Sequence, residues 1–301
     1  MKNRIESSGF AIFLAISGVV MFSAKAVMVK LSYRFDVDVL TILLLRMVFA
    51  LPVYLFIAFR TSGKFNEYRL TRRDVAALIA LGFIGYYAAS YFDFYGLKFI
   101  SASLERLILF VYPTLVILIT WIIFSKKPSK IQILAILITY AGIFLAFAND
   151  LNVSGEGLWK GVVLIFLSAF TYAIYLVGSG RLIPRIGPVR FTAYAMIVSC
   201  ILVILHYSVV HSTEVFHQPW QIYALGLSMA IFSTVVPSFL IAEAIKRIGA
   251  SNFAIYGSLG PISTIILAVI FLGETLDHYQ IAGTIVVIIG VSIINLKTAQ
   301  K

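Results

Sequence analysis

Charged side chains are scarce in this sequence of 301 residues. Asp, Glu, Lys and Arg together make up 12% of it, whereas hydrophobic residues make up 61%. Soluble globular domains average about 25% charged and about 45–50% apolar residues. The scarcity of charge therefore excludes an ordinary soluble domain and predicts a protein that lies largely within a membrane.

Cysteine and the common catalytic signatures are also rare or missing. The single Cys200 excludes an internal disulfide. No His-Glu-x-x-His, P-loop or Gly-x-Ser-x-Gly pattern occurs, and no two aspartates are paired within the apolar runs. We therefore expect neither an enzyme nor a protein that is driven directly by ATP, and we expect no cofactor and no metal site.

Long apolar runs fill the sequence instead. Each is close to the length of about 20 residues that a helix needs to cross a hydrocarbon core of about 30 Å. The runs are continuous rather than alternating, which favours helices over a β-barrel. The sequence predicts an all-α polytopic membrane protein with ten transmembrane helices, at 9–31, 39–59, 74–96, 99–124, 130–148, 158–178, 190–210, 220–242, 248–272 and 278–296.

The net charge of +11 is distributed unevenly along the chain. Outside the predicted spans, most Lys and Arg residues fall in the termini and in the alternate loops on the same side. Only Lys30, Arg34, Lys98 and Lys160 fall on the other side. By the positive-inside rule, both termini are cytoplasmic. This bias explains the basic composition, so we do not expect nucleic acid as a partner.

Residues 98–143 align with residues 246–291 without a gap when the sequence is shifted by 148 positions. Among the matches, Pro113, Gln132 and Gly142 coincide with Pro261, Gln280 and Gly290. Five predicted spans per half is an odd number, so the second half must be inverted in the membrane. We predict two inverted five-helix repeats, residues 1–150 and 151–301, an architecture typical of secondary transporters.

Short motifs are spread over both halves. The second half contains Gly260-Pro261, Phe271-Leu272-Gly273-Glu274, Gln280 and Gly290, and the first contains Leu40-Thr41 to Arg46, Ser101-Ala102-Ser103, Pro113 and Gln132 to Gly142. With these motifs the chain resembles the EamA-type, ten-helix members of the drug/metabolite transporter superfamily. The resemblance implies a central cavity lined mainly by spans 1, 3, 4, 6, 8 and 9. It leaves the substrate open, because the family includes metabolite and drug exporters and some importers.

Five charged residues fall within predicted spans and more than two residues from either end, where burial of a charge is costly: Lys25, Arg46, Asp93, Glu105 and Arg106. All are expected in the outer half of the membrane, where they could form one cluster. Three cations against two carboxylates leave one cation unpaired, so we predict that Lys25 or Arg106 binds a substrate carboxylate. Glu105 then holds a substrate ammonium or exchanges a proton, with Asp93 as the other coupling candidate. The alternative is a purely structural ion-pair network, and Arg46 is expected to be structural.

The spans assigned to the cavity also carry tyrosines and small polar residues. A tyrosine offers a flat apolar face and one hydrogen-bonding group, which suits an organic solute. Besides the charged residues, the expected substrate-binding residues are Tyr87, Tyr91, Tyr112, Tyr172, Tyr175, Asn252 and Tyr256. The expected gating kinks are Pro113, Pro261, Gly257 and Gly260. Ordinary helix packing explains these aromatic and small residues equally well.

The combined interpretation is a secondary active transporter in the bacterial inner membrane that moves a small polar metabolite by alternating access. An amino acid or related zwitterion is the favoured substrate, because charges of both signs are available, and efflux is the favoured direction. The expected partners are the substrate, the lipid bilayer and protons, and the expected state is a monomer or homodimer. Two alternatives stay open: a flippase or carrier subunit for an amphipathic lipid, and an importer of a cationic or zwitterionic metabolite.

Overall fold

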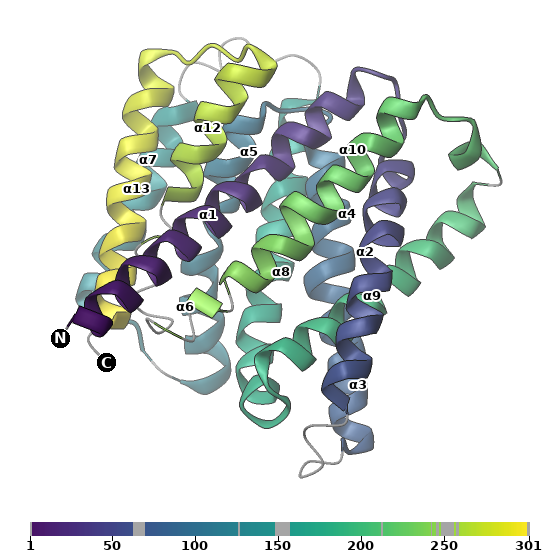
Figure 1. Cartoon of the computed structure of the whole chain (residues 1–301). Coiled ribbons are helices and arrows are strands. Elements are labelled where there is room, and N and C mark those ends of the chain that lie inside the picture. Colours follow the sequence, from purple (N-terminus) through teal and green to yellow (C-terminus); the bar gives the residue numbers. More distant parts are fainter. Residues whose placement is uncertain are drawn as a thin grey trace.

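The computed structural model describes residues 2–62, 70–125, 127–147, 157–211, 213–241, 243–244, 247, 256 and 259–299. Helices account for nearly all of these residues, and none of them forms a strand (Figure 1). Seven of the helical segments are long and apolar enough to cross a membrane. The described part of the chain is thus an all-helical, polytopic membrane protein, as predicted.

The seven long apolar segments coincide with seven of the predicted spans. They are Phe10–Tyr33, Val39–Thr61, Arg72–Gly96, Ala102–Phe124, Leu158–Ile186, Pro188–Val210 and Trp220–Ile241. The other predicted spans, 130–148, 248–272 and 278–296, fall on shorter apolar helices, which are Lys130–Ala146, Leu259–Leu272 and His278–Gly290. The predicted end of the sixth span at residue 178 was wrong. That helix continues to Gly187, whose φ of +85° suits glycine and stops the helix.

In chain order the elements are α1 (Lys2–Tyr33), α2 (Val39–Ser62), α3 (Arg72–Gly82), η1 (Phe83–Ala88), α4 (Ala89–Gly96), α5 (Ala102–Leu109), α6 (Tyr112–Phe124), α7 (Lys130–Phe147), α8 (Leu158–Ile186), α9 (Pro188–Val210), η2 (Glu214–His217), α10 (Trp220–Ala230), η3 (Ile231–Val235), α12 (Leu259–Leu272) and α13 (His278–Ala299). The elements η1 and η3 are π-helical and η2 is a 3₁₀-helix.

The fourth predicted span is two helices rather than one kinked helix. Helix α5 ends at Leu109, and α6 begins at Tyr112 after a short turn. Pro113 therefore lies in the first turn of a new helix, where its missing N–H removes no helical hydrogen bond. The described part of α12 begins at Leu259, two residues before Pro261, and Gly257 lies outside the described residues.

Helix boundaries recur at a spacing of 148 residues. Helices α3 and α10 begin at 72 and 220, η1 and η3 at 83 and 231, and α7 and α13 at 130 and 278. The starts of α7 and α13 are capped alike. The backbone amide of Ser129 donates to Gln132 Oε1 (2.9 Å), and that of Asp277 donates to Gln280 Oε1 (3.4 Å). The two glutamines that match between the halves, Gln132 and Gln280, are therefore each the third helical residue of a capping box.

Glycine brings α7 and α13 into close contact, and the two helices lie side by side (Figure 1). A Cβ atom on Gly283 would lie 2.5 Å from the backbone nitrogen of Ala146, and one on Gly290 would lie 2.8 Å from that of Thr139. No real Cβ atom approaches a backbone atom so closely. The absence of a side chain at these positions therefore sets the distance between the two helices.

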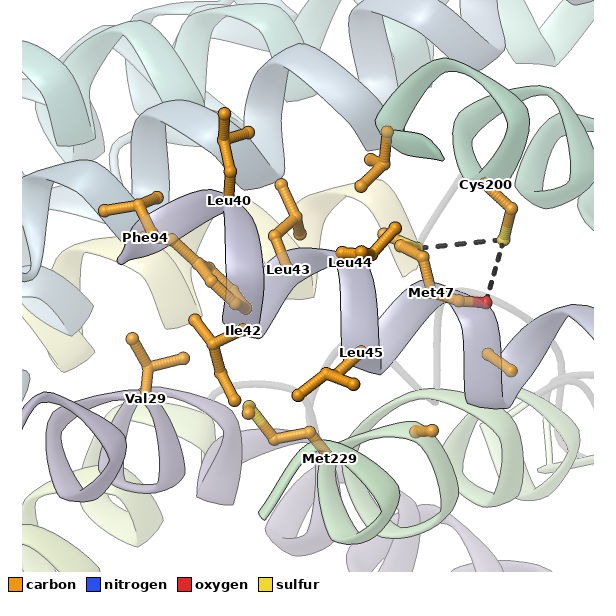
Figure 2. Close-up of a cluster of buried hydrophobic side chains, with 14 of the residues drawn as sticks. Val29, Leu40, Ile42, Leu43, Leu44, Leu45, Met47, Phe94, Cys200 and Met229 are labelled. Carbon is orange, nitrogen blue, oxygen red and sulfur yellow. Dashed lines mark hydrogen bonds between the residues drawn. The ribbon is translucent and has the colours of Figure 1, made fainter. Parts of the chain in front are cut away.

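Helix α2 packs against α4, α9 and α10 at the centre of the largest apolar cluster (Figure 2). Leu43 and Met47 of α2 and Met229 of α10 are completely buried. Cys200 of α9 is buried as well, and its Sγ lies 3.4 Å from the Met47 carbonyl oxygen. The lone cysteine of the chain is thus part of the packed core.

Substitution of the α13 glycine tests the packing of α7 against α13. We expect Gly283→Ala to destabilise the protein by about 1–3 kcal/mol, because the added methyl group forces the two helices apart. Gly180→Ala is the matched control, since a Cβ atom there meets nothing within 4 Å. Thermal unfolding of the detergent-solubilised protein measures both, and equal melting temperatures for the two variants would contradict this account.

Candidate functional site

Three buried charges from three helices form a contiguous cluster. Lys25 Nζ of α1 lies 2.5 Å from Asp93 Oδ2 of α4 and 3.7 Å from Glu105 Oε1 of α5. Their exposed fractions are 7%, 1% and 0%. Sequence reasoning predicted that these charges would come together, and the structure brings these three together. One lysine is therefore shared by two carboxylates in a region of low dielectric.

The two carboxylates differ in how well they are satisfied. Asp93 accepts a hydrogen bond from Lys25 through Oδ2. Neither carboxylate oxygen of Glu105 accepts a hydrogen bond from the described residues, and both oxygens are buried. A buried carboxylate without hydrogen bonds is costly while it is charged. Glu105 is thus the group of this cluster that gains most from a proton or from a cationic partner.

Helix α5 is held in place by a residue from the other half of the sequence. Glu274, in the loop after α12, accepts hydrogen bonds from the backbone amides of Ala102 (2.7 Å) and Ser103 (3.1 Å) and from the Ser103 hydroxyl (2.6 Å). A carboxylate at a helix N-terminus satisfies free amides and complements the helix dipole. Glu274 therefore fixes the start of the helix that carries Glu105. The sequence singled out this residue only as part of a motif.

Arg106 lies next to the three-residue cluster in the chain but makes no ion pair within 4.0 Å among the described residues. Its guanidinium instead stacks over the rings of Phe22 and Phe110, at 5.9 and 5.5 Å. Its Nη2 donates to the Ser23 hydroxyl (3.4 Å), while its buried Nε has no hydrogen-bond partner in the described part of the chain. Arg106 is thus a buried cation that neutral groups hold in place.

Gly260 makes room for this arginine. A Cβ atom on Gly260 would lie 2.6 Å from Arg106 Nη2. The Gly260 carbonyl oxygen accepts from the Ser23 hydroxyl (3.2 Å), and Thr264 Oγ1 donates to the Ser23 carbonyl oxygen (3.2 Å). Gly260 was predicted as a gating kink, and the structure gives it a steric role beside Arg106. Sequence reasoning missed Ser23 and Thr264, because a small polar residue in an apolar helix carries no distinctive signal.

Arg46 is a second buried arginine, which interacts electrostatically with Asp93 and whose buried Nη1 has no hydrogen-bond partner among the described residues. Its Nε donates to Thr234 Oγ1 of η3 (2.9 Å), and its guanidinium lies over the Phe94 ring at 5.3 Å. It makes no ion pair within 4.0 Å with a described carboxylate. The five intramembrane charges are therefore one cluster of three, with Arg106 beside it and Arg46 elsewhere.

The predicted tyrosines separate into two groups. Tyr112, Tyr172 and Tyr175 form a chain of ring contacts with centroid distances of 5.3 and 5.9 Å. Tyr86, which was not among the expected binding residues, extends this chain, since the Tyr175 hydroxyl donates to the Tyr86 hydroxyl (3.0 Å). The chain reaches Arg106 through Phe110, whose ring lies 5.9 Å from that of Tyr112.

Tyr87 and Tyr91 belong to the second group. Their rings stack at 6.5 Å, and the Tyr87 hydroxyl lies 2.7 Å from Nδ1 of His206 on α9. Tyr86 and Tyr87 face different neighbours because adjacent residues of a helix point in different directions. The predicted residue Tyr256 packs against the cluster around Leu14, far along α1 from Lys25, and Asn252 lies outside the described residues.

Comparison with known proteins identifies the kind of protein that has this fold. A family model described as the EamA-like transporter family matches residues 9–148 and 159–296. YcbK of Bacillus subtilis, named an uncharacterized transporter, is 32% identical over 305 residues, which cover 98% of this chain and 96% of that protein. A solved crystal structure matches 94% of this chain and 95% of its own with a TM-score of 0.63, at 14% identity, which concerns the fold alone.

Two more distant relatives carry informative names. The inner membrane transporter YicL of Salmonella typhimurium, also named uncharacterized, is 21% identical over 264 residues, or 86% of this chain and 85% of that protein. The threonine/homoserine exporter RhtA of the same species is 26% identical over 164 residues, or 54% of each protein. The relatives are thus named as transporters.

Neutral substitutions in the cluster test its charge balance. Lys25→Met leaves Asp93 and Glu105 without the only cation that lies within 4.0 Å of either in the described structure, whereas Asp93→Asn leaves Lys25 with Glu105. Loss of one partner of a buried pair costs about 3–5 kcal/mol. We therefore expect Lys25→Met to lower the melting temperature more than Asp93→Asn does. Lys130→Met, at an exposed site, is the control, and the reverse order of the first two would refute the arrangement.

A double-mutant cycle tests the close approach of Gly260 to Arg106. Gly260→Ala should cost about 1 kcal/mol of stability, because the new methyl group must displace the end of the flexible Arg106 side chain from its aromatic neighbours. Most of this loss should vanish in an Arg106→Ala background, where the collision is absent. Thermal unfolding of the four proteins gives the coupling energy. A loss of the same size in both backgrounds would show that Gly260 serves backbone geometry instead.

Proposed function

This chain belongs to the EamA-like transporter family, and from that premise we propose that it is a secondary transporter that carries a small zwitterionic metabolite by alternating access. The observation that carries the proposal is the uneven pairing of the buried charges. Lys25 is shared by Asp93 and Glu105, while Arg106 is buried with no carboxylate within 4.0 Å among the described residues. A carboxylate from the solute would complete the pairing, because an unpaired buried charge is strongly unfavourable.

An amino acid or a related zwitterion fits this arrangement best. Its carboxylate would bind Arg106, and its ammonium would bind Glu105, whose oxygens accept no hydrogen bond from the described residues. The adjacent chain of Tyr112, Tyr172 and Tyr175 offers flat apolar faces for a side chain. The name of the relative RhtA, a threonine/homoserine exporter, supports an amino-acid substrate and export as the direction.

Glu105 is the proposed coupling residue. It is completely buried, and its nearest described cation, Lys25, is closer to Asp93 than to Glu105. Glu105 can thus exchange a proton or a substrate ammonium at a smaller cost than Asp93, whose pairing with Lys25 is closer. A proton gradient would then drive transport through alternate occupation of Glu105 by a proton and by substrate.

The recurring helix boundaries support the proposed repeat. Spacings of 148 residues between helix starts, π-helical turns and caps fit two inverted five-helix halves, 1–150 and 151–301, which together would make ten spans. The first turns of α1 and the last turns of α13 lie at the same end of the bundle (Figure 1), which agrees with both termini on one side. The basic loops favour the cytoplasmic side, and the name of YicL favours the inner membrane.

Reconstituted transport tests the proposal directly. Proteoliposomes with an imposed pH gradient would be assayed with a panel of radiolabelled amino acids, of which threonine and homoserine come first. We expect Glu105→Gln and Arg106→Ala each to lower flux by about tenfold or more, because each removes one charge that binds the zwitterion. Glu105→Gln should also abolish any dependence of flux on the pH gradient.

Glu214→Gln is the matched control, since this carboxylate lies in the exposed loop before α10. It should transport normally at equal protein levels. Near-normal flux by both Glu105→Gln and Arg106→Ala would show that these two residues do not bind the substrate. Translocation of a fluorescent lipid, with no flux of any amino acid, would favour the flippase alternative. Flux only from the periplasmic to the cytoplasmic face of the protein would favour an importer.

A further inference from the structure

A pocket of about 760 Å³ opens where α1, α4 and α12 end. Its volume lies within the range of about 300–1,000 Å³ that is typical of small-molecule sites. The residues that matter here are Lys30 and Tyr33 of α1, Arg34 directly after α1, Lys98 of the α4–α5 loop, and Glu274 of the loop after α12. We call it the mouth pocket. It is separate from the buried cluster around Lys25.

Neutral groups hold all three cations of the mouth pocket. Lys30 Nζ donates to the carbonyl oxygens of Leu97 and Ile100, both at 3.1 Å. Arg34 Nη2 donates to the Leu272 carbonyl oxygen (3.2 Å), and Lys98 Nζ lies 5.7 Å from the centre of the Tyr33 ring. No ion pair within 4.0 Å involves these cations in the part of the chain that the structure describes. None of the three is thus directly paired, although Lys30 lies close enough to Glu274 for an electrostatic interaction.

The carboxylates of the mouth pocket offset these charges only in part. Glu274 accepts three hydrogen bonds at the N-terminus of α5, where the helix amides partly neutralise its negative charge. Asp36 is exposed, as are Arg34 and Lys98, so water screens all three of these charges. The pocket thus has three cations against two carboxylates, one of which is engaged elsewhere. A concave surface with excess charge of one sign concentrates small ions of the other sign.

The floor of the mouth pocket is Tyr33. Its hydroxyl donates to the carbonyl oxygen of Phe94 (2.6 Å), the residue next to Asp93 in α4. Lys25, Val29 and Tyr33 are spaced four residues apart and lie on one face of α1, so Tyr33 is two helical turns from the buried cluster. Tyr33, which lines the mouth pocket, therefore lies on the same face of α1 as Lys25, with the buried Val29 between them.

We propose that the mouth pocket is a second, superficial binding site for the carboxylate of the solute, and that Tyr33 closes the path from it to the buried charges. The role in passage rests on the proposed transport function, whereas the preference for anions is a property of the pocket alone. Lys30, Arg34 and Lys98 attract the carboxylate without burying it. Movement of Tyr33 away from Phe94 then gives the solute access to Lys25 and Arg106.

The charge preference can be measured without a transported substrate. In a Cys200→Ser background, Leu272→Cys places a thiol in the mouth pocket, and Ser101→Cys is a second probe of the same pocket. The probes are two membrane-impermeant methanethiosulfonates, one with an anionic sulfonatoethyl group and one with a cationic trimethylammonioethyl group. We expect the anionic-to-cationic rate ratio to exceed that of free cysteine by about tenfold. Lys30→Gln and Lys98→Gln should each reduce this ratio by about threefold.

Phe216→Cys, on the exposed loop before α10, is the control and should show a ratio that neither lysine substitution changes. The anion site would be overturned if the anionic-to-cationic rate ratio at either pocket thiol equals that of free cysteine. It would also be overturned if neither lysine substitution changes this ratio. This result would leave the transport proposal intact. If the protein without these substitutions carries no amino acid while the pocket thiols show the expected preference for the anionic reagent, the transport proposal alone is overturned.

A buried thiol tests the role of Tyr33. Val29→Cys lies one turn below Tyr33 and is fully buried. It should resist the anionic reagent when Tyr33 is intact or replaced by phenylalanine, which keeps the ring. Tyr33→Ala should raise the labelling rate of the thiol at position 29 by about tenfold or more. Without the Tyr33 ring, the anionic reagent that the pocket cations concentrate can reach this thiol. Equal labelling with and without the ring would refute Tyr33 as the barrier.

Discussion

The ion pair between Lys25 and Asp93, shared with Glu105, is the interaction on which the site depends. Charges in the hydrocarbon core are tolerated only when they face the interior of a bundle and find partners there. This requirement fixes how α1, α4 and α5 face one another, since each contributes one of the three groups. Arg106 follows Glu105 in the same short helix, so it too points into the bundle rather than into lipid, and it is 6% exposed.

Segments from the second half of the sequence complete this arrangement. Glu274 caps the start of α5, and Gly260 leaves the space that the Arg106 guanidinium occupies. Both residues come from the motif-bearing region around α12, whereas the charges come from the first half. The chemistry is therefore asymmetric even though helix boundaries recur at a spacing of 148 residues. In the sequence shift that relates the halves, Glu105 and Arg106 stand opposite the uncharged Phe253 and Ala254.

Two levels of binding follow from where the cations lie. Arg106 is deep and dry, so its interaction with an anion is strong but carries a large desolvation cost. Lys30, Arg34 and Lys98 are nearer to water, where interactions are weaker but desolvation is small. A solute that meets the shallow cations first gains attraction before it loses its hydration. In this structure the Tyr33 hydroxyl donates to the Phe94 carbonyl oxygen, and this is the contact that we propose separates the two levels.

The sequence by itself determined the helical class, the positions of seven long spans and the five intramembrane charges. These are local properties, because apolar length and the cost of a buried charge depend on residues close together in the chain. Only the tertiary structure decided which charges pair, that Arg106 stands beside Gly260, and that Tyr86 rather than Tyr87 joins the inner tyrosines. Adjacent helical residues point about 100° apart, so a position in the sequence does not reveal which helix a side chain will face.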